Sequence, residues 1–219
     1  SDSDAKQLYD YGLQANGSFN GDYDRHQKQT RSRFAIEDTW TPDLNWLNQA
    51  KVQLSYSPQK REFWSNRQQT NAANKAVHTY SSTNYEETFL QADVQLESQF
   101  ETGPVSHTLT YGFQGDHTQA DYDNLTVTNT NGTIVSKPAG GFNFANATNR
   151  RADLYVQDEI RLFDDKLLLT PGIRWATYHI SPKPDADYVS IAGKEPRQID
   201  SKEWVPQIGA VFKLDDHYS

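Results

Sequence analysis

The feature that most constrains this chain is a two-residue alternation between apolar and polar side chains, repeated along much of its length. In residues 48–57, Ala50, Val52, Leu54 and Tyr56 fall on one side of an extended chain, and the polar residues between them fall on the other. A strand places successive side chains on opposite faces, whereas a helix would mix the two sets. The pattern therefore predicts β-strands with one apolar and one polar face.

The same alternation recurs in five further segments, which are residues 86–101, 105–115, 151–163, 167–179 and 204–214. Two weaker examples are residues 9–19 and 32–40. The expectation is an all-β chain of about eight antiparallel strands of about ten residues, the length with which a tilted strand crosses a bilayer. Such strands make up the wall of an up-and-down transmembrane β-barrel.

The connections between these segments alternate between short and long. The short ones consist of turn-forming residues, at Thr41-Pro42-Asp43, Thr102-Gly103-Pro104 and Asp164-Asp165-Lys166. The long ones are residues 58–85, 117–150 and 180–202, with a shorter example at 20–30. Outer-membrane barrels have tight periplasmic turns at one end and long extracellular loops at the other. The connections therefore favour a barrel wall of this kind.

Composition agrees with a barrel that has a wet interior. Only 35% of the residues are hydrophobic and the mean hydropathy is -0.86, yet 12% are aromatic. No apolar run approaches the roughly 18 residues of a membrane helix, and no segment has the pattern of a signal peptide. Trp40, Phe100, Phe163 and Trp204 lie near the ends of predicted strands, as in an interfacial aromatic girdle, although ordinary packing at turns would also explain them.

Several function classes lose support from the sequence. The net charge of -8 and the lack of a basic stripe argue against a nucleic-acid partner. The absence of cysteine excludes a disulfide framework and a Cys nucleophile, and leaves the redox compartment open. The adjacent pairs Glu86-Glu87 and Asp164-Asp165 would point to opposite faces of a strand, so neither pair suits acid–base catalysis. We therefore expect no enzymatic activity.

Three segments in the last third of the chain carry a family resemblance. They are Leu-Tyr-Val-Gln-Asp-Glu-Ile at 154–160, Leu-Thr-Pro-Gly-Ile-Arg-Trp at 169–175 and Val-Pro-Gln-Ile-Gly-Ala-Val-Phe at 205–212. They resemble consecutive barrel strands of TonB-dependent receptors, in which a Tyr-x-Gln-Asp strand, a Gly-x-Arg strand and a Pro-x-x-Gly strand follow one another. The resemblance covers residues 153–219, and upstream it rests on the strand pattern alone. It is nearest to the haem and haemoglobin receptor branch, while siderophore receptors have similar strands.

The resemblance implies that residues 1–219 are part of a larger receptor barrel without its plug domain, in the outer membrane of a Gram-negative bacterium. The missing Met and the abrupt ends at Ser1 and Ser219 would suit a piece of a longer chain. The implied partners are outer-membrane lipid, the receptor's own plug domain, TonB and, at the extracellular loops, a haem-carrying protein. Haem or a ferric chelate would be the transported ligand, and no bound cofactor is expected.

Two sets of residues are candidates for functional contacts. The polar rows would line the barrel lumen and contact the plug or a passing substrate, although mixed charges could simply solvate the interior. The chief lumen candidates are Lys51, Asp93, Arg151, Asp153, Arg161 and Arg174, with Gln91, Gln95 and Glu159 in the same rows. The candidates for ligand contact on the predicted loops are Trp64, His78, Tyr80, His117, Tyr122 and His179, together with the further aromatics Phe63, Phe142 and Phe144.

The histidines have two readings. Imidazole suits haem iron, so His78, His117 and His179 could reach a haem from loops. Lone loop histidines are more often solvated, and the axial histidines of the resembling family lie in its plug and in a loop outside this chain. No resident metal site is therefore expected. His107 lies in register with a lipid-facing row and is expected to be interfacial.

Two alternatives to a receptor wall remain open. A non-specific porin would have shorter loops and would lack the family segments. A soluble β-sandwich that binds carbohydrate or protein would bury its apolar rows against each other.

Overall fold

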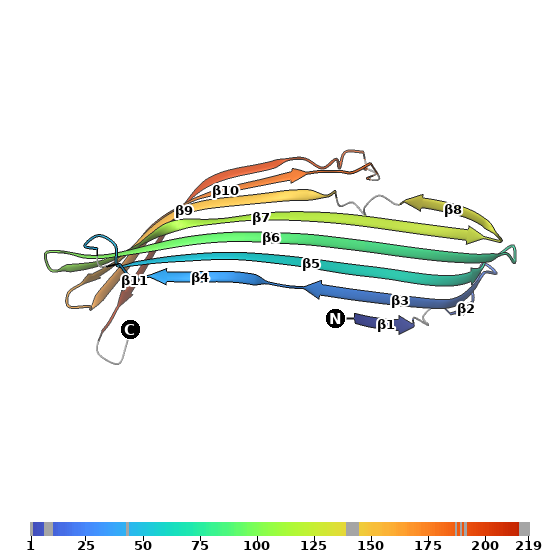
Figure 1. The fold of residues 1–219 in the computed structure, drawn as a ribbon, viewed down its shortest axis with the longest axis horizontal. Coiled ribbons are helices and arrows are strands. Elements are labelled where there is room, and N and C mark those ends of the chain that lie inside the picture. Colours follow the sequence, from blue (N-terminus) through green and yellow to red (C-terminus); the bar gives the residue numbers. More distant parts are fainter. Residues whose placement is uncertain are drawn as a thin grey trace.

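In the computed structural model, the described residues form one antiparallel sheet (Figure 1). They are residues 2–6, 11–42, 44–138, 145–186, 188, 190 and 192–214. The strands are β1 (Asp2–Lys6), β2 (Gly12–Leu13), β3 (Phe19–Arg31), β4 (Phe34–Trp40), β5 (Gln49–Thr70), β6 (Ala76–Thr102), β7 (Val105–Thr130), β8 (Thr133–Pro138), β9 (Ala147–Leu162), β10 (Leu167–Pro182) and β11 (Ile199–Phe212). The all-β, antiparallel prediction is confirmed. Within the described ranges, no helix could span a membrane.

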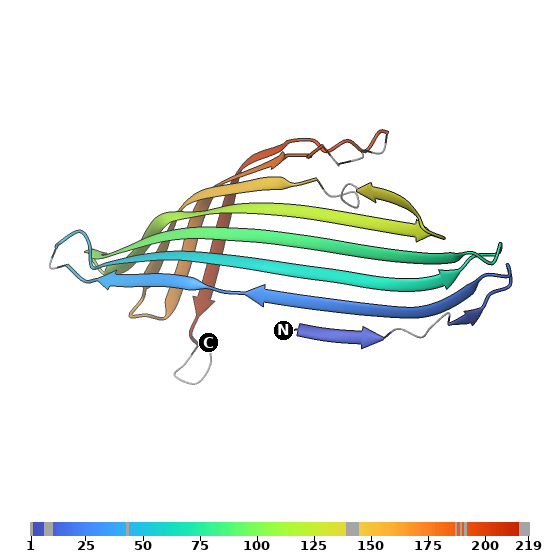
Figure 2. The same ribbon diagram turned by 45° about the vertical axis from the view of Figure 1, so that its right-hand side comes forward.

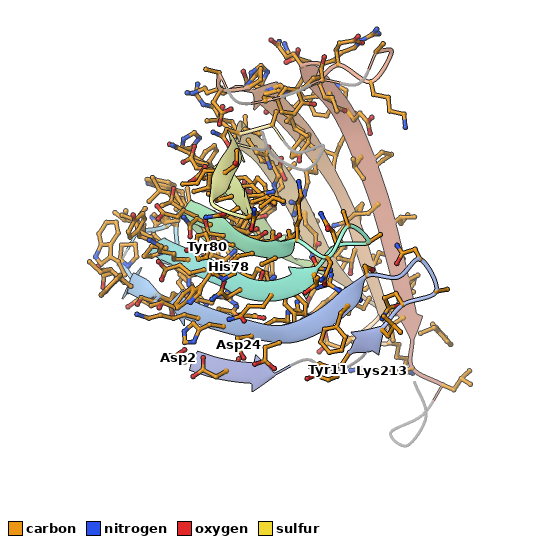
Figure 3. The ribbon with its side chains drawn as sticks, turned by 90° about the vertical axis from the view of Figure 1, so that its right-hand side faces the viewer. Asp2, Tyr11, Asp24, His78, Tyr80 and Lys213 are labelled. Carbon is orange, nitrogen blue, oxygen red and sulfur yellow. The ribbon has the colours of Figure 1, made fainter. Side chains whose placement is uncertain are left out.

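The strands follow one another along the sheet in chain order. The path is β1-β3-β5-β6-β7-β9-β10-β11, with β2 paired to β3, β4 to β5 and β8 to β7. The sheet is bent, and β9, β10 and β11 turn away from the plane of the earlier strands (Figure 2). Viewed from the end where the long hairpins close, the sheet curves around an open trough (Figure 3). Its edge strands β1 and β11 do not pair, so these strands form a curved wall and not a closed cylinder.

The short turns lie where the sequence predicts them. Gly103, between β6 and β7, has a φ of 63°, a left-handed conformation that glycine adopts without steric cost. Between β9 and β10, Phe163, Asp164 and Asp165 all have positive φ. The third turn, between β4 and β5, contains an isolated bridge from Leu44 to Leu47. Asp43, which is part of that predicted turn, lies outside the described residues.

The predicted long loops are for the most part β-hairpins. Residues 58–85 continue β5 to Thr70 and begin β6 at Ala76, so only residues 71–75 form a turn. Residues 117–150 continue β7 to Thr130 and return as β8, and residues 20–30 lie within β3. Among the connections whose residues the structure describes, only the one between β10 and β11 includes a long segment without strands. The interpretation of loops was wrong because water bathes both faces of these segments, which removes the apolar alternation without preventing strand pairing.

The first predicted strand is also different. Within residues 9–19 the structure has only the short β2, which pairs with Phe19 and Asn20 of β3 across a turn at 14–18; Tyr9 and Asp10 lie outside the described residues. The predicted strand 32–40 corresponds to β4. β3 and β4 both pair with β5, and only Ser32 and Arg33 separate them. Ser32 N donates a hydrogen bond to Pro58 O of β5.

The sheet has two faces of different character. On the outward, convex face, Val52, Leu54, Leu90 and Leu154 are 41–58% exposed. Leu47 is the only hydrophobic residue that is buried in the described part of the chain. The buried polar residues include Ser55, Ser65 and Asp153 on the inward face. The sheet thus turns its apolar rows away from its own interior, which excludes the β-sandwich alternative.

The outward apolar rows form a belt that crosses the strands obliquely. On β5 and β6 the belt extends farthest from the short turns and ends at the cross-strand pair Tyr56 and Leu90. On β7, β9 and β10 it ends earlier, at the paired Phe113, Leu154 and Trp175. A belt of constant depth crosses a sheet in this way when the strands are tilted, as they are in membrane barrels.

We call the part of the sheet that carries this belt the belted wall; it comprises residues 34–40, 49–57, 89–116, 151–162, 167–176 and 203–212. The strands beyond the belt form the polar extension, which comprises β1, β2, β3, β8 and residues 58–70, 76–88 and 117–130. Residues 76–88 of β6 alone extend about 40 Å at about 3.3 Å per residue.

Candidate functional site on the inward face

A compact network of charged side chains lies on the inward face of the belted wall. Its centre is Asp153 of β9, which is 3% exposed. Arg174 of β10 donates a hydrogen bond from Nη1 to Asp153 Oδ2 at 3.0 Å, and Arg151 Nε forms an ion pair with the same oxygen at 3.2 Å. Arg151 also donates from Nη2 to Gln114 Oε1 at 2.6 Å. Two guanidinium groups on neighbouring strands therefore hold one buried carboxylate.

The cross-strand register places all of the predicted lumen residues on this inward face: Lys51, Asp93, Arg151, Asp153, Arg161 and Arg174. Most of them pair with each other or with a charged neighbour. The Lys51 Nζ to Glu37 Oε1 distance is 3.0 Å, and the Arg161 Nη2 to Glu159 Oε1 distance is 2.6 Å. The network can therefore solvate and stiffen the wall. Its contact with a plug domain or a ligand stays a prediction.

The inward face of the polar extension carries arginines and aromatic rings. The Arg25 guanidinium lies 4.8 Å from the centre of the Phe63 ring and 5.8 Å from that of Tyr23. Arg67, the cross-strand partner of Tyr23, lies 5.5 Å from the centre of the Tyr23 ring. Cations within about 6 Å of an aromatic face are attracted to it. These contacts hold the guanidinium groups over rings on the inward side of β3 and β5.

Arg61 and Tyr85 continue this inward surface toward β6, where they are cross-strand partners. Burial, followed by the charge of the Glu87 carboxylate and a hydrogen bond to it, raises the pKa of the Tyr85 phenol above its ordinary value of 10.0. Gln59 also donates a hydrogen bond to Glu87. The carboxylate is therefore engaged by its neighbours on the wall.

The sequence interpretation missed the cluster formed by Tyr23, Arg25, Arg61, Arg67 and Tyr85. Its signal was present in the spacing of Arg61, Phe63 and Arg67, which are two and four residues apart and therefore share one face of a strand. That spacing was overlooked because residues 58–85 were interpreted as a loop.

All of the histidines in the described ranges lie on the outward face: His26, His78, His107, His117 and His179. The prediction that His78, His117 and His179 project from loops was wrong, because they lie in β6, β7 and β10. His107 pairs with Asp158 at 2.8 Å on the outward side of the belted wall. No group of three or more His, Asp or Glu side chains in the described part of the chain could hold a metal ion.

The predicted aromatic contacts are divided between the two faces. Trp64 and Tyr80 lie outward, and Trp64 stacks on His26 with ring centres 3.8 Å apart. Tyr80 lies two residues from His78 on β6 (Figure 3). Tyr122 lies inward, opposite Tyr85. The predicted contacts therefore do not converge on one site. Phe142 and Phe144 lie outside the described residues, and Phe63 lies inward beside Arg25.

An oblique outward apolar belt, a charged inward face and short turns at one end define the wall of an outer-membrane β-barrel. The chain belongs to the TonB-dependent receptor family, since the family model described as "TonB dependent receptor-like, beta-barrel" matches residues 1–219. It is therefore an outer-membrane protein of Gram-negative bacteria.

The chain is also similar to a solved structure, the crystal structure of BauA, the ferric preacinetobactin receptor from Acinetobacter baumannii. The two chains are 14% identical, with a TM-score of 0.47 over 91% of this chain. This chain spans 29% of the length of that receptor. None of the curated proteins matches it.

Proposed function

We propose that this chain forms part of the wall of a receptor that takes up an iron complex across the outer membrane. The observation that carries the proposal is the division of the wall, apolar outside and charged inside, in a chain of the TonB-dependent receptor family. Proteins of this family are transporters and receptors and not enzymes. In this proposal the intact receptor binds its ligand above a plug domain, and TonB supplies the energy that moves the plug.

The structure bears on the choice between haem and a ferric chelate. A histidine that ligates haem inside a barrel must face the lumen, because the iron can only be reached from there. The described histidines all face outward. The inward surface offers guanidinium groups and aromatic rings instead. We therefore favour a ferric chelate, and we keep haem as the second candidate because of the resemblance of residues 153–219.

Deletion of the gene for the full-length receptor tests this proposal. The expected result is loss of growth on the ferric chelate as the sole iron source, with growth on haem unchanged. Collapse of the proton gradient should abolish uptake of the labelled ferric chelate in the parent strain, because TonB-coupled transport needs that energy. Loss of haem use alone would favour the second candidate. Unchanged growth on every iron source, together with unchanged uptake of labelled iron complexes, would contradict a role in iron uptake.

A further inference from the structure

The charges of the polar extension are sorted by sign between its two faces. On the inward side of β3, β5, β6 and β7 beyond the belt, the register places the arginines Arg25, Arg31, Arg61 and Arg67. Glu87 is the only acidic residue that the register places there. A chain with a net charge of -8 thus has a cationic surface on the inside of the receptor entrance.

The outward side of the same strands has the opposite balance. The register places five carboxylates there: Asp24, Glu62, Glu86, Asp121 and Asp123. It places two lysines there, Lys28 and Lys60. Lys60 is neutralised, with its Nζ 3.0 Å from Glu86 Oε1 and 3.3 Å from Glu62 Oε1, and these two carboxylates raise its pKa. An anion near the outside of the extension is therefore repelled, and one near the inside is attracted.

Three of the four inward arginines are available for a ligand. Arg31, Arg61 and Arg67 form no ion pair with any residue in the described ranges, and Arg67 Nε is buried without a hydrogen-bond partner. Arg31 and Arg33 line a cavity of about 320 Å³ at the base of the extension, beside Phe89 and the engaged carboxylate of Glu87. The wall thus has unneutralised guanidinium groups both along its inward face and at the bottom of the entrance.

We propose that this inward surface selects a ferric chelate that carries several negative charges and aromatic rings, of the tris-catecholate class. The inference rests on the proposed uptake of a ferric chelate and names the charge class of that ligand. Guanidinium groups donate two parallel hydrogen bonds to paired anionic oxygens, and catecholate oxygens are presented in pairs. Tyr23, Phe63 and Tyr85 supply faces and edges for the rings of the chelate. A concave cationic surface also steers anions to the entrance.

Binding to the full-length receptor tests the proposal with two probes of similar size. One is an iron(III) tris-catecholate, which is trianionic, and the other is an uncharged iron(III) trihydroxamate. We expect the anionic probe to bind at least about tenfold more tightly. Its affinity should fall when the ionic strength rises from about 0.1 M to about 1 M, because the Debye length shortens from about 10 Å to about 3 Å. The affinity of the uncharged probe should change little.

The matched variants are the triple substitution Arg25→Gln, Arg61→Gln and Arg67→Gln, and the control Arg150→Gln. Arg150 lies on the outward face of β9, so its loss removes a positive charge without changing the inward surface. The triple variant should bind the anionic probe about ten- to a hundredfold more weakly, whereas the control should bind like the parent. Heat-modifiable migration in gels checks that each variant is folded. If the triple variant does not fold, the salt dependence of the unmodified receptor decides.

The outcomes separate this inference from the function on which it rests. Equal affinity for both probes, or affinity for the anionic probe that salt does not change, would overturn the charge selection while leaving chelate uptake intact. A receptor that binds neither probe and supports no growth on ferric chelates would overturn the proposed function and this inference with it. A receptor that prefers the uncharged probe would overturn the inference alone.

Discussion

The belted wall and the polar extension are built from the same strands and differ in how they distribute charge. In the belted wall the outward side is mostly apolar, and the inward charges neutralise each other, as Asp153 does with Arg151 and Arg174. In the polar extension both faces are polar, and the charges are separated by sign across the sheet. One ladder of hydrogen bonds therefore supports two surfaces: a wall whose inside is self-neutralised, and an extension whose inside carries mainly positive charge.

The difference follows from what surrounds each region. Lipid around the belted wall disfavours unpaired charge on its outer face, where Asp158 is paired with His107, so most of the charged residues gather inside and compensate each other. Water around the polar extension permits charge on either face, so the sign on each face is free to serve binding and steering.

Arginine on the outward face should be costly in the belted wall and tolerated in the polar extension. Ile173 of β10 lies within the belt and is 40% exposed, so Ile173→Arg places a charge in lipid. A cost of about 2–4 kcal/mol is expected near the bilayer midplane. The matched control, Leu125→Arg on the outward face of β7 in the extension, should change stability by less than about 0.5 kcal/mol. Urea titration of the full-length receptor in lipid vesicles measures both.

An equal loss of stability for these two substitutions would contradict the boundary between the two regions. A large cost at Leu125 alone would mean that lipid reaches the extension and that the belt has been placed at the wrong depth.

An added methyl group on the inward side of the belted wall should lower the free energy of unfolding where the strands are in close contact. A Cβ at Gly112 would collide with the Val94 carbonyl oxygen and would lie 2.9 Å from the Tyr155 hydroxyl. Gly112→Ala should therefore lower the free energy of unfolding by about 1–3 kcal/mol. At Gly172 the nearest atom is the mobile end of the Gln207 amide, so Gly172→Ala should cost less than about 1 kcal/mol. A reversed order in urea midpoints would contradict this packing.

The same boundary explains how much of the fold could be predicted from the sequence. Residues such as Leu154 and Val156 alternate with polar neighbours because lipid lies on one side, and the strands of the belted wall were predicted from them. In residues 117–124 of β7 the outward side chains are His117, Gln119, Asp121 and Asp123, so no apolar alternation marks the strand there. A hairpin signal was present even so. Asn131-Gly132, with φ values of 50° and 87°, forms the tight turn that joins β7 to β8.

The inward cluster depended on long-range pairing that no local pattern contains. Arg67 and Tyr23 are 44 positions apart in the chain and meet only because β3 pairs with β5 in one register. The sequence predicted inward residues where lipid fixed the outward side, as for Asp153 and Arg174. It could not assign a face to Arg61 or Tyr85, since the residues beside them are polar on both sides.

Removing the central carboxylate should expose how far the belted wall depends on charge compensation. Asp153→Asn leaves Arg151 and Arg174 without their shared partner. Because these side chains are 37% and 41% exposed, solvent screens part of the loss, and a destabilisation of about 1–2 kcal/mol is expected. Glu159→Gln, which breaks an exposed pair with Arg161, should cost less than about 0.5 kcal/mol. Equal urea midpoints for the two variants would indicate that Asp153 is dispensable.

The smallest effect is expected at an exposed pair beyond the belt, where Asp200 Oδ1 lies 2.5 Å from His179 Nδ1. Hydrogen bonds from His179 and Gln198 lower the pKa of Asp200 below its ordinary value of 3.8. A carboxyl whose pKa is depressed by folding stabilises the folded state above its unfolded pKa, and this contribution disappears as the pH falls through the folded pKa. Asp200→Asn should therefore lower the urea midpoint slightly at pH ~7, and this effect should disappear as the pH falls through the folded pKa of Asp200. Asp158→Asn, which breaks the more buried pair with His107 at the level of the belt, should lower the midpoint further at neutral pH. Water screens the Asp200 pair but is excluded from the outward face of the belt, so the Asp158 variant should be the less stable of the two. The opposite order would contradict the division into two regions.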